Sequence, residues 1–356
     1  MSINKKHFHP NFYFCPKKDW LEIQTIDLHT CGQPLRVITN GLPKLKGNNV
    51  LAFRKDFQTR WDHYRKILMH EPRGHKDMYG CALTPPNDSK ATFGVVFFHN
   101  QGYSTMCGHA MIALTTLAYQ LHWIANKNQN TLFIDAPCGR IKNWPMMESD
   151  ELVGAGFLGV PSFTLKLDGE LDIPELGKIT FDIAYGGAFY AYVDLTKNAL
   201  NIDLETTKIQ EISHLGMKIK NAIMASSIEI KHPFVEDLSF LYGTIFYASS
   251  KNPAIDSKNV CVFANGQIDR SPTGSGLMGR LALLNKRNEI QKNQAIRVQS
   301  PLGTTFIGMI VKEQEYGPYQ GIIPSISGSA YITGKHTFWV HPKDMFPNGF
   351  ELGETI

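Results

Sequence analysis

Short runs of apolar residues, each bounded by turn-forming residues, recur along most of the chain. The stretch ATFGVVFFHNQG stays apolar for several consecutive positions and then ends in polar residues and glycine, which is typical of a buried strand followed by a turn. The same pattern predicts strands within residues 21–30, 91–102, 130–144, 178–195, 243–250, 258–266, 295–311 and 325–340.

Helical periodicity is confined to a few segments. Helices are predicted within residues 48–71, 107–123, 204–225 and 274–286. Strands therefore outnumber helices, and the pattern predicts an α/β or α+β fold in which sheet dominates.

The two halves of the chain resemble each other when position 107 is placed over position 273, an offset of 166 residues. The segment VFFHNQGYSTMCG then aligns without gaps on VFANGQIDRSPTG, and both segments lead into a helical pattern. The flanking pairs MYG with LYG and DAPCG with QSPLG follow in the same order, with shifts of two or three residues. Chance similarity between strand–turn–helix units is the alternative, but the common order favours an internal duplication.

A duplicated strand, turn and helix has a chemical consequence. Two helices related by a pseudo-twofold axis can point their N-termini at one place between two domains, and each N-terminus carries unpaired N–H groups and partial positive charge. Ligands commonly bind at domain interfaces. We therefore expect an anion site, for example for a carboxylate, where the two helices begin.

Composition narrows the class of protein. The chain has 356 residues, enough for about two domains, with 43% hydrophobic and 19% charged residues, which excludes a disordered chain. The net charge is +4 and the basic residues are scattered, so nucleic-acid binding has little support. No apolar run is long enough to span a membrane, and the N-terminus lacks the pattern of a signal peptide. We expect a cytoplasmic protein without nucleic-acid or membrane partners.

The cysteines and histidines do not form a metal-binding pattern. Six cysteines are too sparse for a disulfide framework, and no CxxC occurs. His70 and His75 in HEPRGH are separated by Pro72 and Gly74, so this segment is predicted to be a turn and not a zinc-binding helix. We expect free thiols and no metal.

Cys107 differs from the other five cysteines by its position. It begins a predicted helix within MCGHAM, where the helix N-terminus can stabilise a thiolate and lower the pKa of the thiol toward neutrality. Gly108 and His109 follow directly and leave backbone N–H groups open to a ligand. We interpret Cys107 as a general base and the other five as buried small hydrophobic residues.

The corresponding position in the second half lies in DRSPTGSG, where Thr273 precedes the helix and Gly274 and Ser275 open it. Neither a phosphate-binding loop nor a dinucleotide fingerprint is present. Asp269 lies four residues before Thr273. In isolation it is compatible with a turn or helix-capping role, but this position makes it a candidate partner for a cationic amine.

The motifs MCGH and DRSPTGSG, together with HTCGQPLRV, EPRGHKDMYG and YGGAFYAYVD, resemble the proline racemase family over nearly the whole chain. The resemblance implies a fold like that of diaminopimelate epimerase and proline racemase, with two similar domains that each wrap mixed β-sheet around a central helix. The first domain is expected to comprise residues 19–186 and 335–356 and the second residues 187–334. The active site would lie between them.

The family's racemases use two cysteines on opposite sides of the substrate α-carbon. Here Cys107 occupies the first position, whereas Thr273 occupies the second. A threonine hydroxyl is a far weaker acid than a thiol, so this combination resembles the trans-3-hydroxy-L-proline dehydratase branch. That branch removes water from its substrate without a cofactor.

Site roles follow from the resemblance, residue by residue. It implies Cys107 as the base, with Thr273 opposite it, and Asp269 as the partner of the ring nitrogen of hydroxyproline. Phe263 matches a family aromatic beside the ring, although a core strand residue is an equal interpretation. The implied binders of the carboxylate and the rest of the substrate are Gly108, His109, Gly274 and Ser275.

Three alternatives stay open at this stage. The chain could be a proline racemase or hydroxyproline epimerase, a protein that only binds a proline analogue, or one with a partner-binding role. A homodimer is compatible with the sequence.

Overall fold

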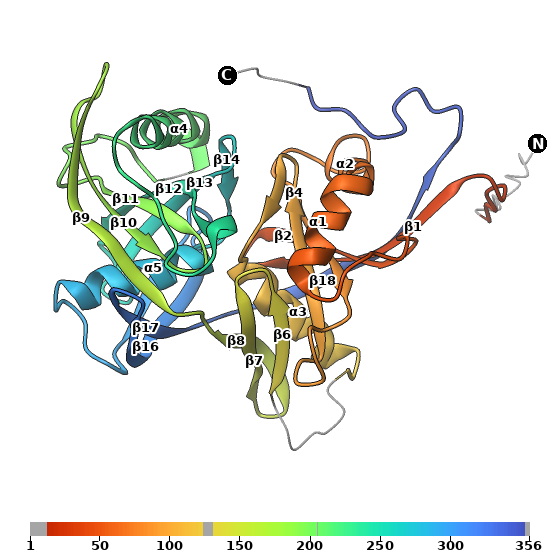
Figure 1. Ribbon diagram of the computed structural model, residues 1–356, viewed down its shortest axis with the longest axis horizontal. Coiled ribbons are helices and arrows are strands. Elements are labelled where there is room, and N and C mark those ends of the chain that lie inside the picture. The colour runs from red at the N-terminus through yellow and green to blue at the C-terminus, as the bar shows by residue number, and fades with distance from the viewer. Residues whose placement is uncertain (1–12, 124–130, 205, 353–356) are drawn as a thin grey trace, which may run out of the picture.

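The computed structural model describes residues 13–123, 131–204 and 206–352 of the chain. Strands dominate it, and they gather into two halves that lie side by side (Figure 1). One half contains the N-terminal strands together with the last strand of the chain. Its strands are β1 (Leu21–Thr30), β2 (Gln33–Asn40), β3 (Tyr79–Thr84), β4 (Phe93–His99), β5 (Gly102–Ser104), β6 (Leu132–Ala136), β7 (Gly139–Glu148), β8 (Glu151–Leu158) and β18 (Ala330–Val340).

The other half is built from the intervening strands. They are β9 (Ser162–Ile173), β10 (Gly177–Tyr185), β11 (Phe189–Asp194), β12 (Leu241–Ser249), β13 (Ser257–Phe263), β14 (Gln267–Asp269), β15 (Ala295–Gln299), β16 (Thr305–Tyr316) and β17 (Tyr319–Gly328). The helices are α1 (Val50–Arg60), α2 (Asp62–Met69), α3 (Gly108–Gln120), α4 (Ile209–Ala225) and α5 (Gly274–Lys286), with short 3-10 turns at Thr206–Lys208 and Glu236–Leu238.

Strand pairing repeats between the halves. β4 pairs antiparallel with β3 and parallel with β6, and β13 pairs in the same way with β12 and β15. β2 runs parallel to β3 as β11 does to β12, and β1 pairs antiparallel with β18 as β10 does with β9. The strand order thus follows the internal duplication expected from the sequence. The mixed, strand-rich fold with few helices agrees with the predicted class.

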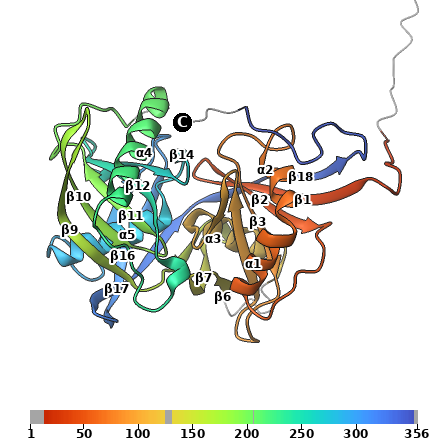
Figure 2. The ribbon, with the colours of Figure 1, turned by 45° about the horizontal axis from the view of Figure 1, so that its top comes forward.

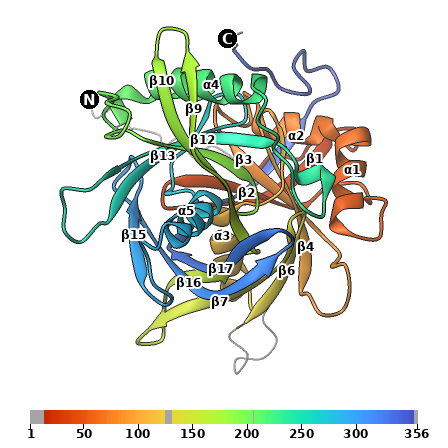
Figure 3. The same ribbon diagram turned by 60° about the vertical axis from the view of Figure 1, so that its left-hand side comes forward.

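Each half encloses one helix. Most residues of α3 and of α5 are buried, because strands surround both helices (Figure 3). A helix that is apolar on every side has no solvent face and must sit inside a shell of other elements. The remaining helices α1, α2 and α4 lie outside the sheets, two on the first half and one on the second (Figure 2).

The predicted helix over residues 48–71 is two helices. Trp61 separates α1 from α2 with φ −129° and ψ 16°, outside the helical region, while its backbone N–H still donates to the Phe57 carbonyl. The break redirects α2 so that Tyr64, Ile67 and Leu68 pack into a satellite core with Phe57. Sequence periodicity alone did not reveal this change of direction.

The repeated topology bears on where one half passes into the other. β10 pairs with both β9 and β11, and β9 follows β8 after residues 159–161. The domain bounds expected from the resemblance, residues 19–186 with 335–356 and residues 187–334, stay a prediction. Across the part of the chain that is described, no helix has the length and apolar character needed to cross a membrane.

Candidate active site

The two enclosed helices begin against each other. A Cβ atom added to Gly108 would lie 2.6 Å from the Gly274 Cα atom, and one added to Gly274 would lie 2.7 Å from the Gly108 Cα atom. Real Cβ atoms do not approach backbone this closely, so only glycine fits at either position. The glycines therefore let the N-termini of α3 and α5 converge, as expected for an anion site between the halves.

Cys107 is the N-cap of α3 and is 4% exposed. Its Sγ atom accepts a hydrogen bond from the Ala110 N–H at 3.3 Å and lies 3.2 Å from Nδ1 of His109. Burial raises the pKa of the Cys107 thiol well above its ordinary value, and the Ala110 N–H opposes this shift only in part. The prediction that the Cys107 pKa is lowered toward neutrality is therefore wrong for the enclosed site. The loss of hydration raises this pKa by more than the N–H groups at the helix N-terminus lower it.

His109 is a neutral partner for this thiol. Burial lowers its pKa to about 3, with a smaller opposing effect from a hydrogen bond to the Pro34 backbone. Proline offers only a carbonyl, so the imidazole must donate in that contact, which leaves its other nitrogen able to accept a hydrogen bond from the thiol. His109 also packs edge-on against Tyr79, with ring centroids 4.8 Å apart.

Thr273 faces the same space from the second half. It is the N-cap of α5 with φ +62°, an uncommon conformation for a β-branched residue. It is 3% exposed, and its Oγ1 atom has no hydrogen-bond partner among the described residues. A buried hydroxyl without a partner is costly, so this group is positioned to bond to something within the site.

Asp269 ends β14 and is buried at 7% exposure. Its Oδ1 atom accepts a hydrogen bond from the Ser271 N–H at 2.8 Å. Burial raises the pKa of this carboxyl to about 6, and the interactions with Ser271, Thr273 and Arg270 oppose the shift only in part. A buried carboxylate whose charge is not fully compensated is suited to receive a cation.

The eight residues singled out from the sequence line one cavity. Besides Cys107, Thr273 and Asp269, these are Phe263, Ser275, His109 and the two helix-opening glycines. Phe263 packs against Tyr242 with ring centroids 5.6 Å apart, and Ser275 Oγ lies 2.8 Å from the Tyr190 hydroxyl oxygen. The free space is only about 20 Å³, room for one water, so the groups are close together and screened from solvent.

Sequence reasoning missed five further residues of this wall. They are Tyr79, Met106, Tyr190, Tyr242 and Cys261. Tyr79 and Tyr242 are the tyrosines of the repeated YG pairs, so the duplication signal already pointed to them. Met106 and Tyr190 lie within the motifs MCGH and YGGAFYAYVD, but nothing in the sequence marked these two positions for the site.

Three of the cysteine interpretations need correction. All six thiols are free, but Cys15 is exposed and Cys138 is only partly buried. Cys261 is buried as expected, yet it lines the cavity and pairs across the strands with Asp269. No group of three or more His, Cys, Asp or Glu side chains within the described residues could hold a metal ion.

Comparison with known proteins adds an independent line of evidence. A trans-3-hydroxy-L-proline dehydratase from Colwellia psychrerythraea is 41% identical over 94% of this chain and 94% of that protein. A 3-hydroxyproline 2-epimerase from Burkholderia multivorans is 38% identical over 92% of this chain and 97% of that protein. A solved hydroxyproline epimerase from Agrobacterium vitis, with bound trans-4-hydroxy-L-proline, superposes with a TM-score of 0.84 at 24% identity, covering 93% of this chain and 96% of that one.

The solved structure shares the fold, which confirms the predicted architecture. Residues 25–351 match the family model described as proline racemase. This match, together with relatives of about 40% identity over nearly the full length, shows that the chain belongs to the proline racemase family.

Proposed function

We propose that this protein dehydrates trans-3-hydroxy-L-proline to 1-pyrroline-2-carboxylate without a cofactor. The observation that carries the proposal is the unequal pair at the two helix starts, a thiol at Cys107 and a hydroxyl at Thr273, in one enclosed cavity. A threonine hydroxyl is too weak an acid to exchange protons with a carbon near neutral pH. Relatives named trans-3-hydroxy-L-proline dehydratase support this reaction.

The convergent helix starts suit the substrate carboxylate. The first N–H groups of a helix have no carbonyl partner within it, and Gly108 and Gly274 bring two such sets together from opposite sides. Removal of the α-proton moves charge onto the carboxylate oxygens. N–H groups already aimed there stabilise that enolate-like state without reorganising.

Asp269 would bind the ring nitrogen. In the enclosed site, burial raises the pKa of its carboxyl to about 6. A secondary ammonium placed beside it would favour the ionised form, because an opposite charge offsets the lost hydration. Phe263, packed on Tyr242, would form the apolar wall against the ring.

Proton transfer would run through Cys107. The reactive form is the Cys107 thiolate, to which the Ala110 N–H donates at 3.3 Å at the N-terminus of α3. The thiolate takes the α-proton, and the C–H electron pair passes into the enolate-like carboxylate. It then returns to form the Cα–Cβ double bond as the C–O bond at position 3 breaks. The Cys107 thiol then protonates the departing hydroxide to give water, and the enamine tautomerises to the cyclic imine.

Substrate stereochemistry tests this one-thiol mechanism. In the trans-3 isomer of L-configuration the hydroxyl lies on the same face as the α-hydrogen, so one thiol can serve both steps. In the cis-3 isomer the hydroxyl lies on the face of Thr273, a poor acid. Trans-4-hydroxy-L-proline has no hydroxyl β to the carbanion and should not dehydrate.

The experiment compares kcat/KM for the three compounds, with detection of the cyclic imine and Cys107→Ser as the control variant. We expect a clear preference for the trans-3 isomer. Equal rates for the cis-3 and trans-3 isomers would rule out a single thiol on one face. Absence of any imine would contradict the dehydratase assignment.

The second candidate is an epimerase or racemase, which the relative named 3-hydroxyproline 2-epimerase favours. That reaction returns a proton to the α-carbon, so it would introduce solvent deuterium there without loss of water. A protein that only binds a proline analogue would do neither. The expected cytoplasmic location and homodimer stay predictions.

A further inference from the structure

The cavity around Cys107 is enclosed, while a much larger pocket lies nearby. Cys107 and Thr273 are 4% and 3% exposed, and the space between them is about 20 Å³. The larger pocket has a volume of about 440 Å³ and is lined by both halves, including Asn100 and Gln267. A ring amino acid could occupy the larger pocket, but it could not reach Cys107 unless the wall between them moved.

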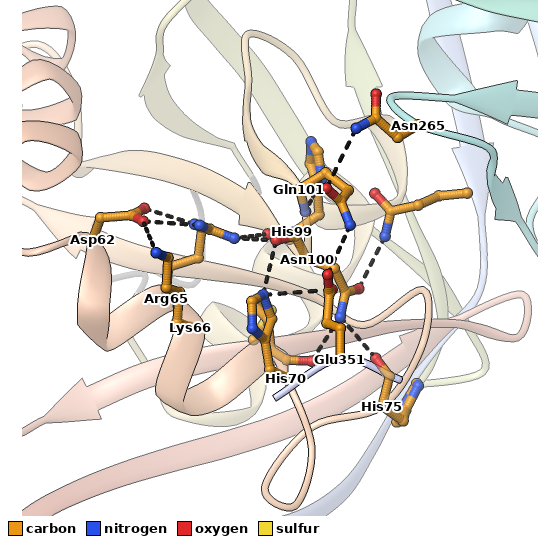
Figure 4. Close-up of polar contacts among 12 residues, drawn as sticks. Asp62, Arg65, Lys66, His70, His75, His99, Asn100, Gln101, Asn265 and Glu351 are labelled. Atoms are coloured by element: carbon orange, nitrogen blue, oxygen red, sulfur yellow. Dashed lines mark hydrogen bonds and ion pairs between the residues drawn. The ribbon is translucent and has the colours of Figure 1, made fainter. Parts of the chain in front are cut away.

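Two tight turns meet at this wall, one from each half (Figure 4). The β4–β5 turn carries Asn100 and Gln101, and the β13–β14 turn carries Asn265. Gln267 Nε2 donates to Asn100 Oδ1 at 2.9 Å, and Asn265 Nδ2 donates to Gln101 Oε1 at 3.4 Å. The two turns occupy equivalent positions in the duplicated halves. Each half therefore contacts the other through the turn that precedes its short third strand, β5 or β14.

Each turn is anchored in its own half by a buried cation. Arg65 Nη1 donates to the backbone carbonyls of His99, at 3.0 Å, and Asn100. Lys220 Nζ donates to the Ala264 carbonyl at 2.7 Å. Charge-assisted hydrogen bonds are stronger than neutral ones. Each turn should therefore remain attached to its own half. If the two halves move apart, the contact between the two turns is where they should separate.

The contact between the turns is only partly satisfied. Gln267 and His99 are 5% and 3% exposed, and Gln267 Oε1 and His99 Nε2 face each other across the two halves without meeting the geometry of a good hydrogen bond. Such a poorly aligned buried pair is weaker than the hydrogen bonds that both atoms would make to water, so exposure to water would recover free energy. This recovery offsets part of what is lost when the Gln267–Asn100 hydrogen bond breaks, so the closed contact can open.

We propose that Asn100 and Gln267 form an interdomain latch. Their hydrogen bond breaks to let a ligand pass from the 440 Å³ pocket to Cys107 and re-forms to enclose it. Both are positioning residues, because neither lines the cavity around Cys107. The identity of the ligand rests on the proposed function, but the latch itself does not.

Alkylation of Cys107 in the full-length protein tests the latch without reference to activity. Iodoacetamide reacts only when the cavity opens, so the labelling rate, followed by peptide mass spectrometry, reports the open fraction. Gln267→Leu keeps the size of the side chain and removes the hydrogen bond. We expect Cys107 to be labelled roughly 2–10-fold faster, the range for one net hydrogen bond.

Two controls distinguish latch opening from other effects. Cys81 is 0% exposed in β3 and outside the cavity, so its labelling reports global unfolding. Gln210→Leu changes a residue of the same 440 Å³ pocket, on α4, that makes no described hydrogen bond across the halves. We expect both Cys81 labelling in Gln267→Leu and Cys107 labelling in Gln210→Leu to match the unaltered protein.

The double variant Asn100→Ala with Gln267→Leu completes the test. The single variants Asn100→Ala and Gln267→Leu are compared with the double variant. If the two residues form one latch, the increase in Cys107 labelling in the double variant should be smaller than the product of the two single increases. Unchanged Cys107 labelling in Gln267→Leu, or a parallel increase at Cys81, would overturn the proposal. Because no substrate is used, failure of the dehydratase assay would leave this result unaffected.

Discussion

Asp269 should make the stability of the protein depend on pH in a direction opposite to that of most carboxylates. Its pKa is about 6 in the folded chain, compared with 3.8 for an aspartate in an unfolded chain, because burial disfavours the ionised form. Below pH 3.8 both states hold the proton and no penalty arises. As pH rises from 3.8 to 6 the unfolded chain loses its proton first, so the folded state loses stability.

The magnitude follows from the two pKa values. The difference between about 6 and 3.8 corresponds to a penalty of ~3 kcal/mol once both states are ionised above pH 6. Between pH 4.5 and 7.5 the change amounts to roughly 2 kcal/mol by the same linkage. Asp269→Asn removes the titration, and its amide oxygen can still accept the Ser271 N–H. The variant should therefore gain stability relative to the unaltered protein as pH rises.

Urea unfolding at several pH values, monitored by circular dichroism, measures this difference. Any constant effect of the substitution cancels, because only its change with pH is compared. Asp168→Asn is a flat control, since Arg287 and Lys197 lower the pKa of Asp168 to about 2 and its titration therefore lies below pH 4. The stability difference between that variant and the unaltered protein should stay nearly constant from pH 4.5 to 7.5. A difference for Asp269→Asn that stays flat from pH 4.5 to 7.5 would refute the assigned pKa.

The remaining predictions concern the two helix starts. Cys107→Ser should lower dehydratase activity at least ~100-fold, because a serine hydroxyl is a poor general base, and a variant that keeps most of its activity would show that another group is the base. In the unaltered protein, pyrrole-2-carboxylate should protect the Cys107 thiol from iodoacetamide. Thr273→Cys should place an acid on the second face and introduce solvent deuterium at the α-carbon of L-proline, measured by NMR. No incorporation in a variant that still dehydrates would contradict this role of position 273. Gly274→Ala should destabilise the fold by about 1–3 kcal/mol in urea, because its Cβ atom would lie 2.7 Å from the Gly108 Cα atom, and an unchanged urea midpoint would mean that the helices move apart freely.

The sequence by itself determined many of the strands and helices and eight of the thirteen residues that line the site, whereas strands such as β2, β3 and β8 were not predicted. Apolar runs with turn residues at their ends specify strands such as β4 and β13, because a buried strand needs apolar residues and its ends need turns. The helix starts after Cys107 and Thr273 were also correctly predicted. The repeat at an offset of 166 residues related these two starts, and the resemblance to the proline racemase family supplied the set of eight candidate residues that line the cavity.

Only the tertiary structure decided the pKa values of the site residues and how a ligand can reach them. The pKa of Cys107 depends on how completely its surroundings exclude water, and the strands that exclude it come from distant parts of the chain. The break at Trp61, the cavity-lining position of Cys261 and the Gln267–Asn100 hydrogen bond likewise depend on contacts between distant segments. Local patterns reflect the conformational preferences of neighbouring residues, whereas desolvation and close approach arise only when remote segments pack together.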